Sequence, residues 1–213
     1  MMKTLRRMAL CRLGIALIVC AGGCSVLAPQ KDESKFFLLS PVGESGNGVP
    51  ASQGRSLSIG IGPVSFPQYL KRPEIVTRVG PDQLKLSENR RWAEPLAENF
   101  QNVLAQDLSQ TLATQQIEIF PWFGTVHIDY QVVIQVDEFD VAADGQSRLK
   151  ARWSIKDASG NLLFATQTIS SSPVSADEPA GTAALSRDVG DLSRQIADRI
   201  RWLNAGGAVT SKS

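Results

Sequence analysis

The sequence has very few residues that could support metal or nucleophilic chemistry. It contains a single histidine, His127, and no cysteine after residue 24. A structural zinc site takes four Cys or His ligands, and a serine hydrolase places its nucleophile in a Gly-x-Ser-x-Gly turn, which is absent. The nearest match to a phosphate-binding loop, Gly60-Ile61-Gly62-Pro63, is broken by its proline. We therefore expect no metal site, no bound cofactor and no catalytic residues.

All three cysteines, Cys11, Cys20 and Cys24, lie at the start of the chain. There the sequence runs from basic residues to the apolar segment 13–19, and then to the small residues 21–23 that precede Cys24. This is the order of a secretory signal, and the apolar segment is shorter than the about 20 residues that span a bilayer. Cleavage before Cys24 would discard two cysteines and leave one at the new N-terminus, where lipidation explains it. The alternative is an ordinary signal peptide in which Cys24 is incidental.

Residues 21–24, Ala-Gly-Gly-Cys, resemble the lipobox of bacterial lipoproteins, with alanine at the position where leucine is more usual. The resemblance implies a signal peptide over residues 1–23, covalent lipid on Cys24 and a lipidated tether over residues 24–34. Several acyl chains anchor a protein stably, because each buried CH₂ contributes about 0.8 kcal/mol. Ser25 follows the cysteine, whereas an aspartate there is associated with retention in the inner membrane. We therefore expect anchoring to the outer membrane, with the domain in the periplasm.

The remaining chain has the composition of one globular domain. Removing the four basic residues of the signal from the 22 in the chain leaves 18 against 21 acidic residues, a net charge of −3. Nucleic-acid binding requires a basic surface, so we expect no nucleic-acid partner. The mature length suits a single domain over residues 35–204, followed by a disordered tail over 205–213.

Periodicity predicts a mixed α/β fold in which two amphipathic helices pack on a largely antiparallel sheet. Short strands are expected at 35–40, 57–64, 74–79, 83–87 and 117–121, with Pro63 and Pro67 ending the second, and the Gly- and Ser-rich segment 43–54 reads as a flexible loop. Apolar residues recur every three or four positions in two segments, which predicts one helix after Pro95 and another up to Gly206-Gly207.

A three-strand meander is predicted between the two helices. Alternation of apolar and polar residues marks strands at 128–137 and 148–155, and turns at Asp144-Gly145 and at 157–161 lead to a third strand at 162–169. Acidic residues of the first strand could face basic residues of the second, contributing about 0.2–1 kcal/mol per pair. The alternative is a solvated set of charges without function.

Several segments together resemble the PqiC-type lipoproteins, which are auxiliary components of ABC-type or MCE-domain (mammalian cell entry) lipid transport systems. The first is the lipobox, followed by an aromatic strand at Phe36-Phe37, where the family often has tyrosines. The specific segments are Tyr69-Leu70-Lys71-Arg72-Pro73 and Trp92-Ala93-Glu94-Pro95-Leu96. The resemblance covers nearly the whole mature chain.

The resemblance implies a non-catalytic outer-membrane lipoprotein. Its partner would be an MCE-domain protein that spans the periplasm from the inner membrane, and together they would move lipids between membranes and support envelope integrity. Self-assembly into a homo-oligomeric ring is also implied.

The two specific segments also allow an interpretation from their residues alone. Pro67 and Pro73 stiffen the segment between them, so Tyr69 and Leu70 could be presented beside Lys71 and Arg72 as an interface anchor. Alternatively, Tyr69 and Leu70 fold inward and cap the sheet. Trp92 is interpreted as a core residue or hydrophobic staple more readily than as a contact, and Glu94-Pro95 as a helix start.

Three functions remain open from the sequence. The first is a lipidated adaptor that docks a transport machine at the outer membrane. The second is a periplasmic carrier that holds acyl chains in its own cavity. The third is an envelope enzyme that uses His127 and strand carboxylates.

Overall fold

The computed structural model of the chain describes residues 33–42, 56–123, 126–177 and 180–207. From Ser34 onward the described residues belong to one compact unit. The predicted signal peptide, Cys24, the loop expected at 43–54 and the end of the tail lie outside the described residues. The predicted cleavage site and the tether therefore stay predictions.

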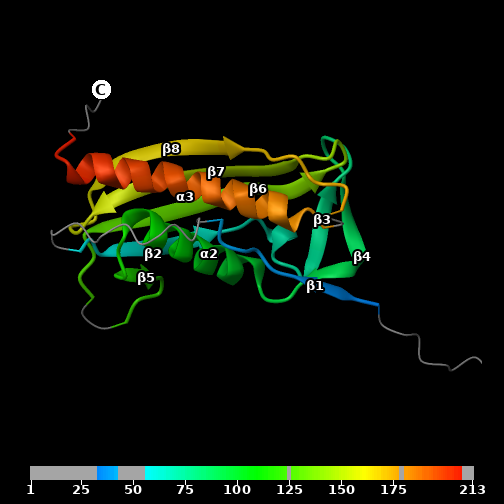
Figure 1. The fold of residues 1–213 in the computed structure, drawn as a ribbon, viewed down its shortest axis with the longest axis horizontal. Helices are drawn as coiled ribbons and strands as arrows, with labels where there is room; N and C mark the ends of the chain where they lie inside the picture. Colours follow the sequence, from blue (N-terminus) through cyan, green and yellow to red (C-terminus); the bar gives the residue numbers. More distant parts are fainter. Residues whose placement is uncertain (1–32, 43–55, 124–125, 178–179, 208–213) are drawn as a thin grey trace, which may run out of the picture. The chain divides into compact units, whose positions relative to one another are not determined.

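The described residues form one eight-stranded mixed sheet and two long helices (Figure 1). The strands are β1 (Lys35–Phe37), β2 (Ile59–Ser65), β3 (Glu74–Arg78), β4 (Leu84–Trp92), β5 (Ile117–Ile119), β6 (Tyr130–Ala142), β7 (Ser147–Asp157) and β8 (Leu162–Ser170). The helices are α2 (Leu96–Leu112), α3 (Thr182–Asn204) and the short 3₁₀ helix η2 (Gln68–Leu70). This confirms the predicted mixed α/β fold.

The central strand β6 joins two parts of the sheet. On one side it begins the predicted meander, pairing antiparallel with β7, which pairs antiparallel with β8. On the other side it pairs in parallel with β2 and with the end of β3. The path then runs outward to β1 through β3 and β4, and to β5 through β2. The long pairings are thus antiparallel, as predicted, while β1, β2 and β5 join the sheet through parallel pairings that local periodicity does not reveal.

Opposite charges on β6 and β7 face one another as the alternation suggested. Arg152 donates hydrogen bonds of 3.0 and 2.9 Å to the Asp137 carboxylate, and Lys150 lies 3.9 Å from Glu138. The Arg152 hydrogen bonds lower the pKa of Asp137 below its ordinary value. These side chains are partly exposed to solvent, which screens their charges, so each pair contributes little stability.

The second strand continues beyond Pro63, contrary to the prediction that this proline ends it. β2 extends to Ser65, and its register against β6 shifts between Ile61 and Val64. Gly62 lies within that shift with a φ of 121°, a region that side chains rarely adopt. A bulge tolerates proline because it already interrupts the ladder of hydrogen bonds.

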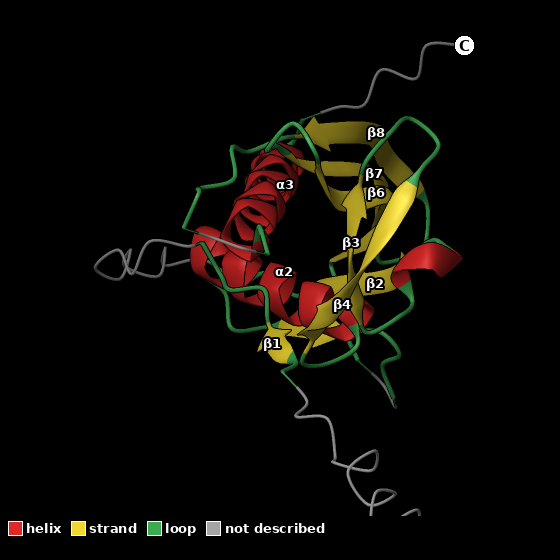
Figure 2. Cartoon of the chain, turned by 90° about the vertical axis from the view of Figure 1, so that its right-hand side faces the viewer, coloured by secondary structure: helices red, strands yellow, loops and turns green. Residues whose placement is uncertain are grey.

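Both helices cover the same side of the sheet (Figure 2). α2 packs on β2 and β5, α3 packs mainly on β7, and the two helices pack against each other. The apolar stripes predicted for both helices are buried, and the core between the layers includes three phenylalanines in edge-to-face contact, Phe66, Phe100 and Phe139. Neither helix is long and apolar enough to cross a membrane, as judged over the described residues.

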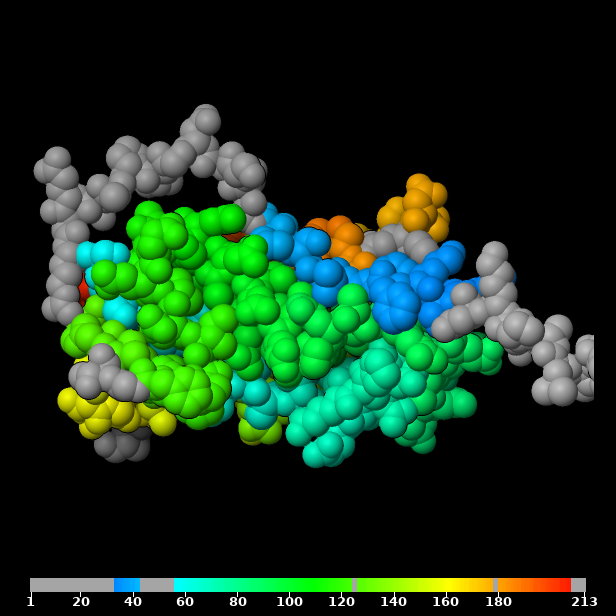
Figure 3. Space-filling view, turned by 90° about the horizontal axis from the view of Figure 1, so that it is seen from below, coloured from blue at the N-terminus to red at the C-terminus, as the bar shows by residue number. Residues whose placement is uncertain are grey.

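The segment 38–42 after β1 lies against both helices. Figure 3 shows it in blue along the green surface of α2. Three of its backbone N–H groups donate to helix side chains: Leu39 to Asn99 at 2.7 Å, Ser40 to Ser186 at 3.1 Å and Val42 to Asp107 at 3.1 Å. The segment that follows the tether is therefore fixed to the body of the domain.

Candidate functional site

The two segments singled out in the sequence meet at one place in the fold. The backbone N–H of Trp92 donates a 2.7 Å hydrogen bond to the carbonyl of Pro73, and β3 pairs with β4 beside this point. The N–H of Ala93 donates to the carbonyl of Phe37, which brings the aromatic first strand to the same place. Three segments far apart in the chain thus share one corner of the sheet.

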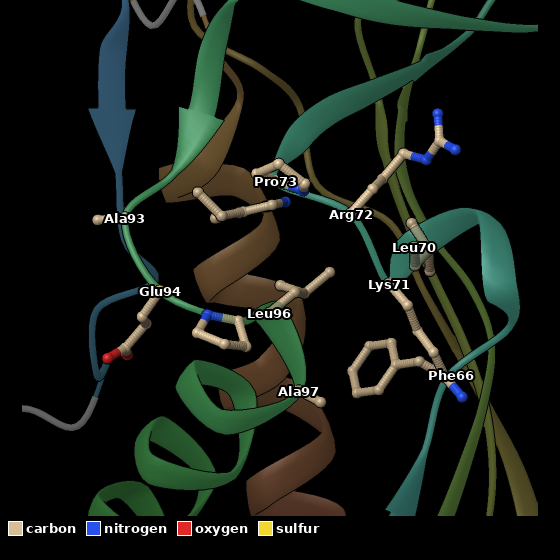
Figure 4. A pocket seen from close by; sticks show the side chains of 11 residues that line it. Phe66, Leu70, Lys71, Arg72, Pro73, Ala93, Glu94, Leu96 and Ala97 are labelled. Atoms are coloured by element: carbon tan, nitrogen blue, oxygen red, sulfur yellow. The ribbon is translucent and has the colours of Figure 1, made fainter.

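A cavity of about 390 Å³ opens where these segments converge. Its wall comes from three sources: Phe66 before η2, the segment from Leu70 to Pro73, and the segment from Trp92 to Ala97. Phe66 and Leu96 extend into the hollow from opposite sides, whereas the Glu94 side chain points away from it (Figure 4). Most of the lining is apolar, so the site is suited to an apolar side chain or an acyl group.

Of the candidate contact residues 69–73, some lie in the interior of the domain and others lie at its surface. Leu70 is only 3% exposed and belongs to the core, so the alternative that it folds inward is correct. Tyr69 is half-buried, with its hydroxyl 3.5 Å from the carbonyl of Asp137, and burial raises its pKa. Lys71, Arg72 and Pro73 are exposed. A contact by this segment would therefore use Lys71, Arg72 and Pro73, with Leu70 forming the floor beneath them.

The second segment supplies the opposite wall and the start of α2. Trp92 and Leu96 are buried core residues, and Pro95 caps the helix. No side chain caps this end, and the N–H groups of Glu98 and Asn99 donate to the Pro95 carbonyl. The backbone between Trp92 and Leu96 must turn from strand to helix, and this turn leaves the hollow beside Ala93 and Ala97. The helix start predicted at Pro95 therefore also shapes the cavity.

Two positively charged side chains, Lys71 and Arg72, lie at the cavity. The ion pairs found among the described residues do not include Lys71 or Arg72. Glu94 lines the same cavity but extends outward from it. A basic rim beside an apolar hollow favours an apolar group that carries a negative charge nearby.

The arrangement around His127 does not resemble a catalytic triad. The exposed His127 ring lies 2.8 Å from the Asp129 carboxylate, but the nearby Ser58 hydroxyl donates to the His127 backbone carbonyl at 2.6 Å. The Ser58 side chain is buried, whereas a nucleophile needs access to substrate. Over the described ranges, no group of three or more potential ligands could hold a metal ion.

Sequence reasoning identified both walls of the cavity but missed Phe66 and Ala97. Phe66 lies between Ser65 and Pro67 and carries no periodic signal, while Ala97 looks like an ordinary helical residue. Both were unpredictable because their position at the site depends on the approach of β2 to the start of α2.

The chain matches a known protein family over most of its length. A family model described as the ABC-type transport auxiliary lipoprotein component matches residues 37–197, which is well over half of the chain. This chain belongs to that family. The auxiliary lipoproteins are components of transport systems of the cell envelope. The family is described as a transport component rather than as an enzyme.

The auxiliary lipoprotein has two curated relatives, which share one name. It is 28% identical over 131 residues to the intermembrane transport lipoprotein PqiC of Escherichia coli (strain K12), and equally to that of Shigella flexneri. The match covers 62% of this chain and 66% of each relative, so slightly less than two thirds of their length is matched.

Solved structures support the fold. An uncharacterized protein has a TM-score of 0.61 at 19% identity, with 78% of this chain and 98% of that chain covered. A protein from Xanthomonas campestris has a TM-score of 0.58 at 15% identity, with 78% and 94% covered. At these identities, the likeness establishes the shared architecture of the auxiliary lipoprotein and nothing about its ligands.

Proposed function

We propose that this lipoprotein is the docking component of an intermembrane lipid transport system at the outer membrane. Its partner would be an MCE-domain protein that spans the periplasm, and the cavity between residues 70–73 and 92–97 would receive an apolar side chain of that partner. The observation that carries the proposal is the convergence of the two specific segments on one exposed apolar hollow.

The relatives support the transport part of this proposal. PqiC of E. coli is named an intermembrane transport lipoprotein. Ser25 after the predicted lipidation site favours the outer membrane, and the apolar hollow favours binding as the role of the domain. Covalent lipid on Cys24 would hold the domain in place.

The structure suggests how the docking would work. Burial of apolar surface contributes about 25 cal/mol per Å², so one large side chain inserted against Phe66, Leu70 and Leu96 would form the centre of the contact. Lys71 and Arg72 lie outside that centre, where charges mainly accelerate association with an acidic partner surface. The apolar hollow would then make docking specific, and the charges of Lys71 and Arg72 would make association fast.

The proposal predicts that charge reversal at the rim weakens partner binding. In K71E/R72E, like charges would face an acidic partner surface, and we expect recovery of the MCE protein to fall about tenfold, the equivalent of ~1.4 kcal/mol. The measurement is photo-crosslinking in native membranes, with the MCE protein quantified by mass spectrometry. A matched control, K85E/K156E, carries the same charge change on β4 and β7, and we expect it to retain binding.

Two outcomes separate the parts of this proposal. Equal recovery from both variants, with equal thermal unfolding midpoints, would show that docking uses another surface. Recovery of no MCE protein even from the wild-type chain would refute the docking function itself.

The cavity also supports a second candidate, a carrier that holds an acyl chain. Its volume of about 390 Å³ is within the range of ligand pockets, and its lining is mostly apolar. Native mass spectrometry of gently purified protein would show a bound lipid of discrete mass beyond the covalent anchor. A domain that carries only its covalent lipid under these conditions would exclude the carrier.

A further inference from the structure

We propose that the aromatic loop, defined as residues 120–123, inserts into the lipid–water interface of the membrane that holds this lipoprotein. The loop follows β5 and reads Phe-Pro-Trp-Phe. This inference rests on the lipoprotein nature of the family and is independent of the docking role proposed for the cavity.

The loop exposes more aromatic surface than a soluble domain needs. Phe123 is 84% exposed and Phe120 is 43% exposed, and no charged residue occurs from Ile119 to Phe123. Single exposed apolar residues are common, but neighbouring exposed aromatic side chains mark surfaces that bind a protein or a membrane.

The fold holds the aromatic loop in a defined position. The N–H of Phe120 donates a 2.8 Å hydrogen bond to the carbonyl of Ile61, and the Phe120 and Trp122 rings pack edge to face with centroids 5.2 Å apart. Two glycines of β2 make room for these rings. A Cβ on Gly60 would lie 3.2 Å from the Trp122 ring, and one on Gly62 would lie 2.6 Å from the Phe120 Cβ. The fold therefore holds Phe120 and Trp122 in place, so these two side chains lose little conformational entropy on insertion.

The chemistry of the loop suits a bilayer interface better than a protein pocket. Phenylalanine provides apolar area, and tryptophan has an apolar ring with one polar N–H, a combination enriched at the headgroup level of membranes. No side chain in the loop carries a charged or amide group that would fix the register of a protein partner. A fluid lipid surface requires no such register.

A membrane lies within reach of this loop in a lipid-anchored chain. Ser34 is the tenth residue after Cys24, and ten steps of the chain span at most about 36 Å. A tether of this length does not fix which side of the domain faces the bilayer, so the aromatic loop can face it.

Membrane contact by the aromatic loop would leave the cavity free for a partner. β5 and β1 form opposite ends of the strand path (Figure 1). Ala93, which lines the cavity, is hydrogen-bonded to Phe37 of β1. One lipoprotein could then meet the membrane through the aromatic loop and its transport partner through the cavity at the same time.

Fluorescence quenching by brominated lipid tests this inference directly. The full lipidated protein is reconstituted in vesicles of phosphatidylethanolamine and phosphatidylglycerol, with and without brominated acyl chains. Trp92 and Trp153 are buried, so Trp122 and Trp202 are the tryptophans with access to solvent. We expect bromination to quench the emission of the wild type and of Trp202→Phe, and we expect Trp122→Phe to abolish the quenching.

A second pair of variants distinguishes insertion of the aromatic loop from non-specific adsorption to the vesicles. Phe123→Ser removes the most exposed aromatic residue of the loop, and we expect it to reduce the quenching of Trp122 about twofold or more because the loop then sits less deeply. Ile169→Ser removes another highly accessible apolar side chain, 72% exposed on β8, and we expect no change.

Two results would overturn the inference. The first is quenching that is unchanged in Trp122→Phe. The second is a Trp122 signal that is insensitive to bromination but shifts with protein concentration or with added partner, which would assign the loop to a protein contact. Neither result bears on the K71E/R72E experiment, so the two proposals fail separately.

Discussion

At the residue scale, the buried carboxylate of Asp188 on α3 is the most unusual feature. Its side chain has no contact with solvent, and the hydroxyls of Ser147, Ser172 and Ser170 lie 2.6, 2.7 and 3.2 Å from its oxygens. Burial raises its pKa, while the serine hydroxyls oppose that rise. Asp188 links α3 to β7 and to the end of β8 through hydrogen bonds rather than through a salt bridge.

The raised pKa of Asp188 predicts a pH-dependent stability. Because the folded state prefers the protonated carboxyl, this contribution is fully present below the unfolded pKa of 3.8 and is lost as the pH rises through the folded pKa. Asp188→Asn has no such titration. We expect the difference in unfolding free energy between wild type and variant to change with pH above 3.8, in favour of the variant as the pH rises.

Urea unfolding at a series of pH values measures this difference. Taking the difference cancels carboxylates such as Asp137, whose lowered pKa acts with the opposite sign and is unaffected by the substitution. A difference that stays constant as the pH rises above 3.8 would contradict the assignment, because a raised pKa requires the stability contributed by Asp188 to decline there.

At the scale of elements, the two helices do more than cover the sheet. Asn99 and Asp107 lie on the inner side of α2, where their oxygens accept hydrogen bonds from the backbone of segment 38–42. Asp107 also accepts from the Ser193 hydroxyl of α3 at 3.3 Å. The helix pair thus fixes the chain where it enters the domain.

Loss of the Asn99 acceptor is expected to destabilise this connection. Asn99→Ala leaves the buried N–H of Leu39 without its 2.7 Å partner, and we expect the unfolding free energy to fall by about 1–3 kcal/mol. The matched control is Asn102→Ala on the exposed side of the same helix, for which we expect a change within about 0.5 kcal/mol. Chemical denaturation measures both, and equal losses would contradict the proposed importance of segment 38–42.

At the scale of the whole molecule, the proposed contacts with the membrane and with a partner both depend on the predicted lipid anchor. Lipidation of Cys24 predicts that the protein from native membranes has a mass that starts at residue 24 and includes acyl groups. We expect Cys24→Ala to lose that added mass and to leave the membrane fraction, because the aromatic loop alone supplies too little buried surface for stable attachment.

Intact mass spectrometry with membrane fractionation measures this outcome. The test needs the full precursor, since cleavage and lipidation depend on residues 1–24. A wild-type product that is unlipidated and cut elsewhere would contradict the anchor, and Cys24 would then be incidental.

The helices and the meander follow directly from the sequence. Apolar spacing after Pro95 predicts a helix that the structure gives as Leu96–Leu112, and strict alternation with turns at Asp144-Gly145 and 157–161 predicts β6, β7 and β8. These elements were predictable because their signals are local. Each depends on an amphipathic face or a turn that is formed by residues close together in the chain.

Only the tertiary structure determined the site. The parallel pairing of β2 with β6, the meeting of Pro73 with Trp92, and the packing of Phe120 on Gly62 each join residues far apart in the chain. The sequence did single out both walls of the cavity through a family resemblance, but not that they face each other, nor that Leu70 is its floor. Such contacts depend on how the layers pack, and the sequence next to a residue does not indicate that packing.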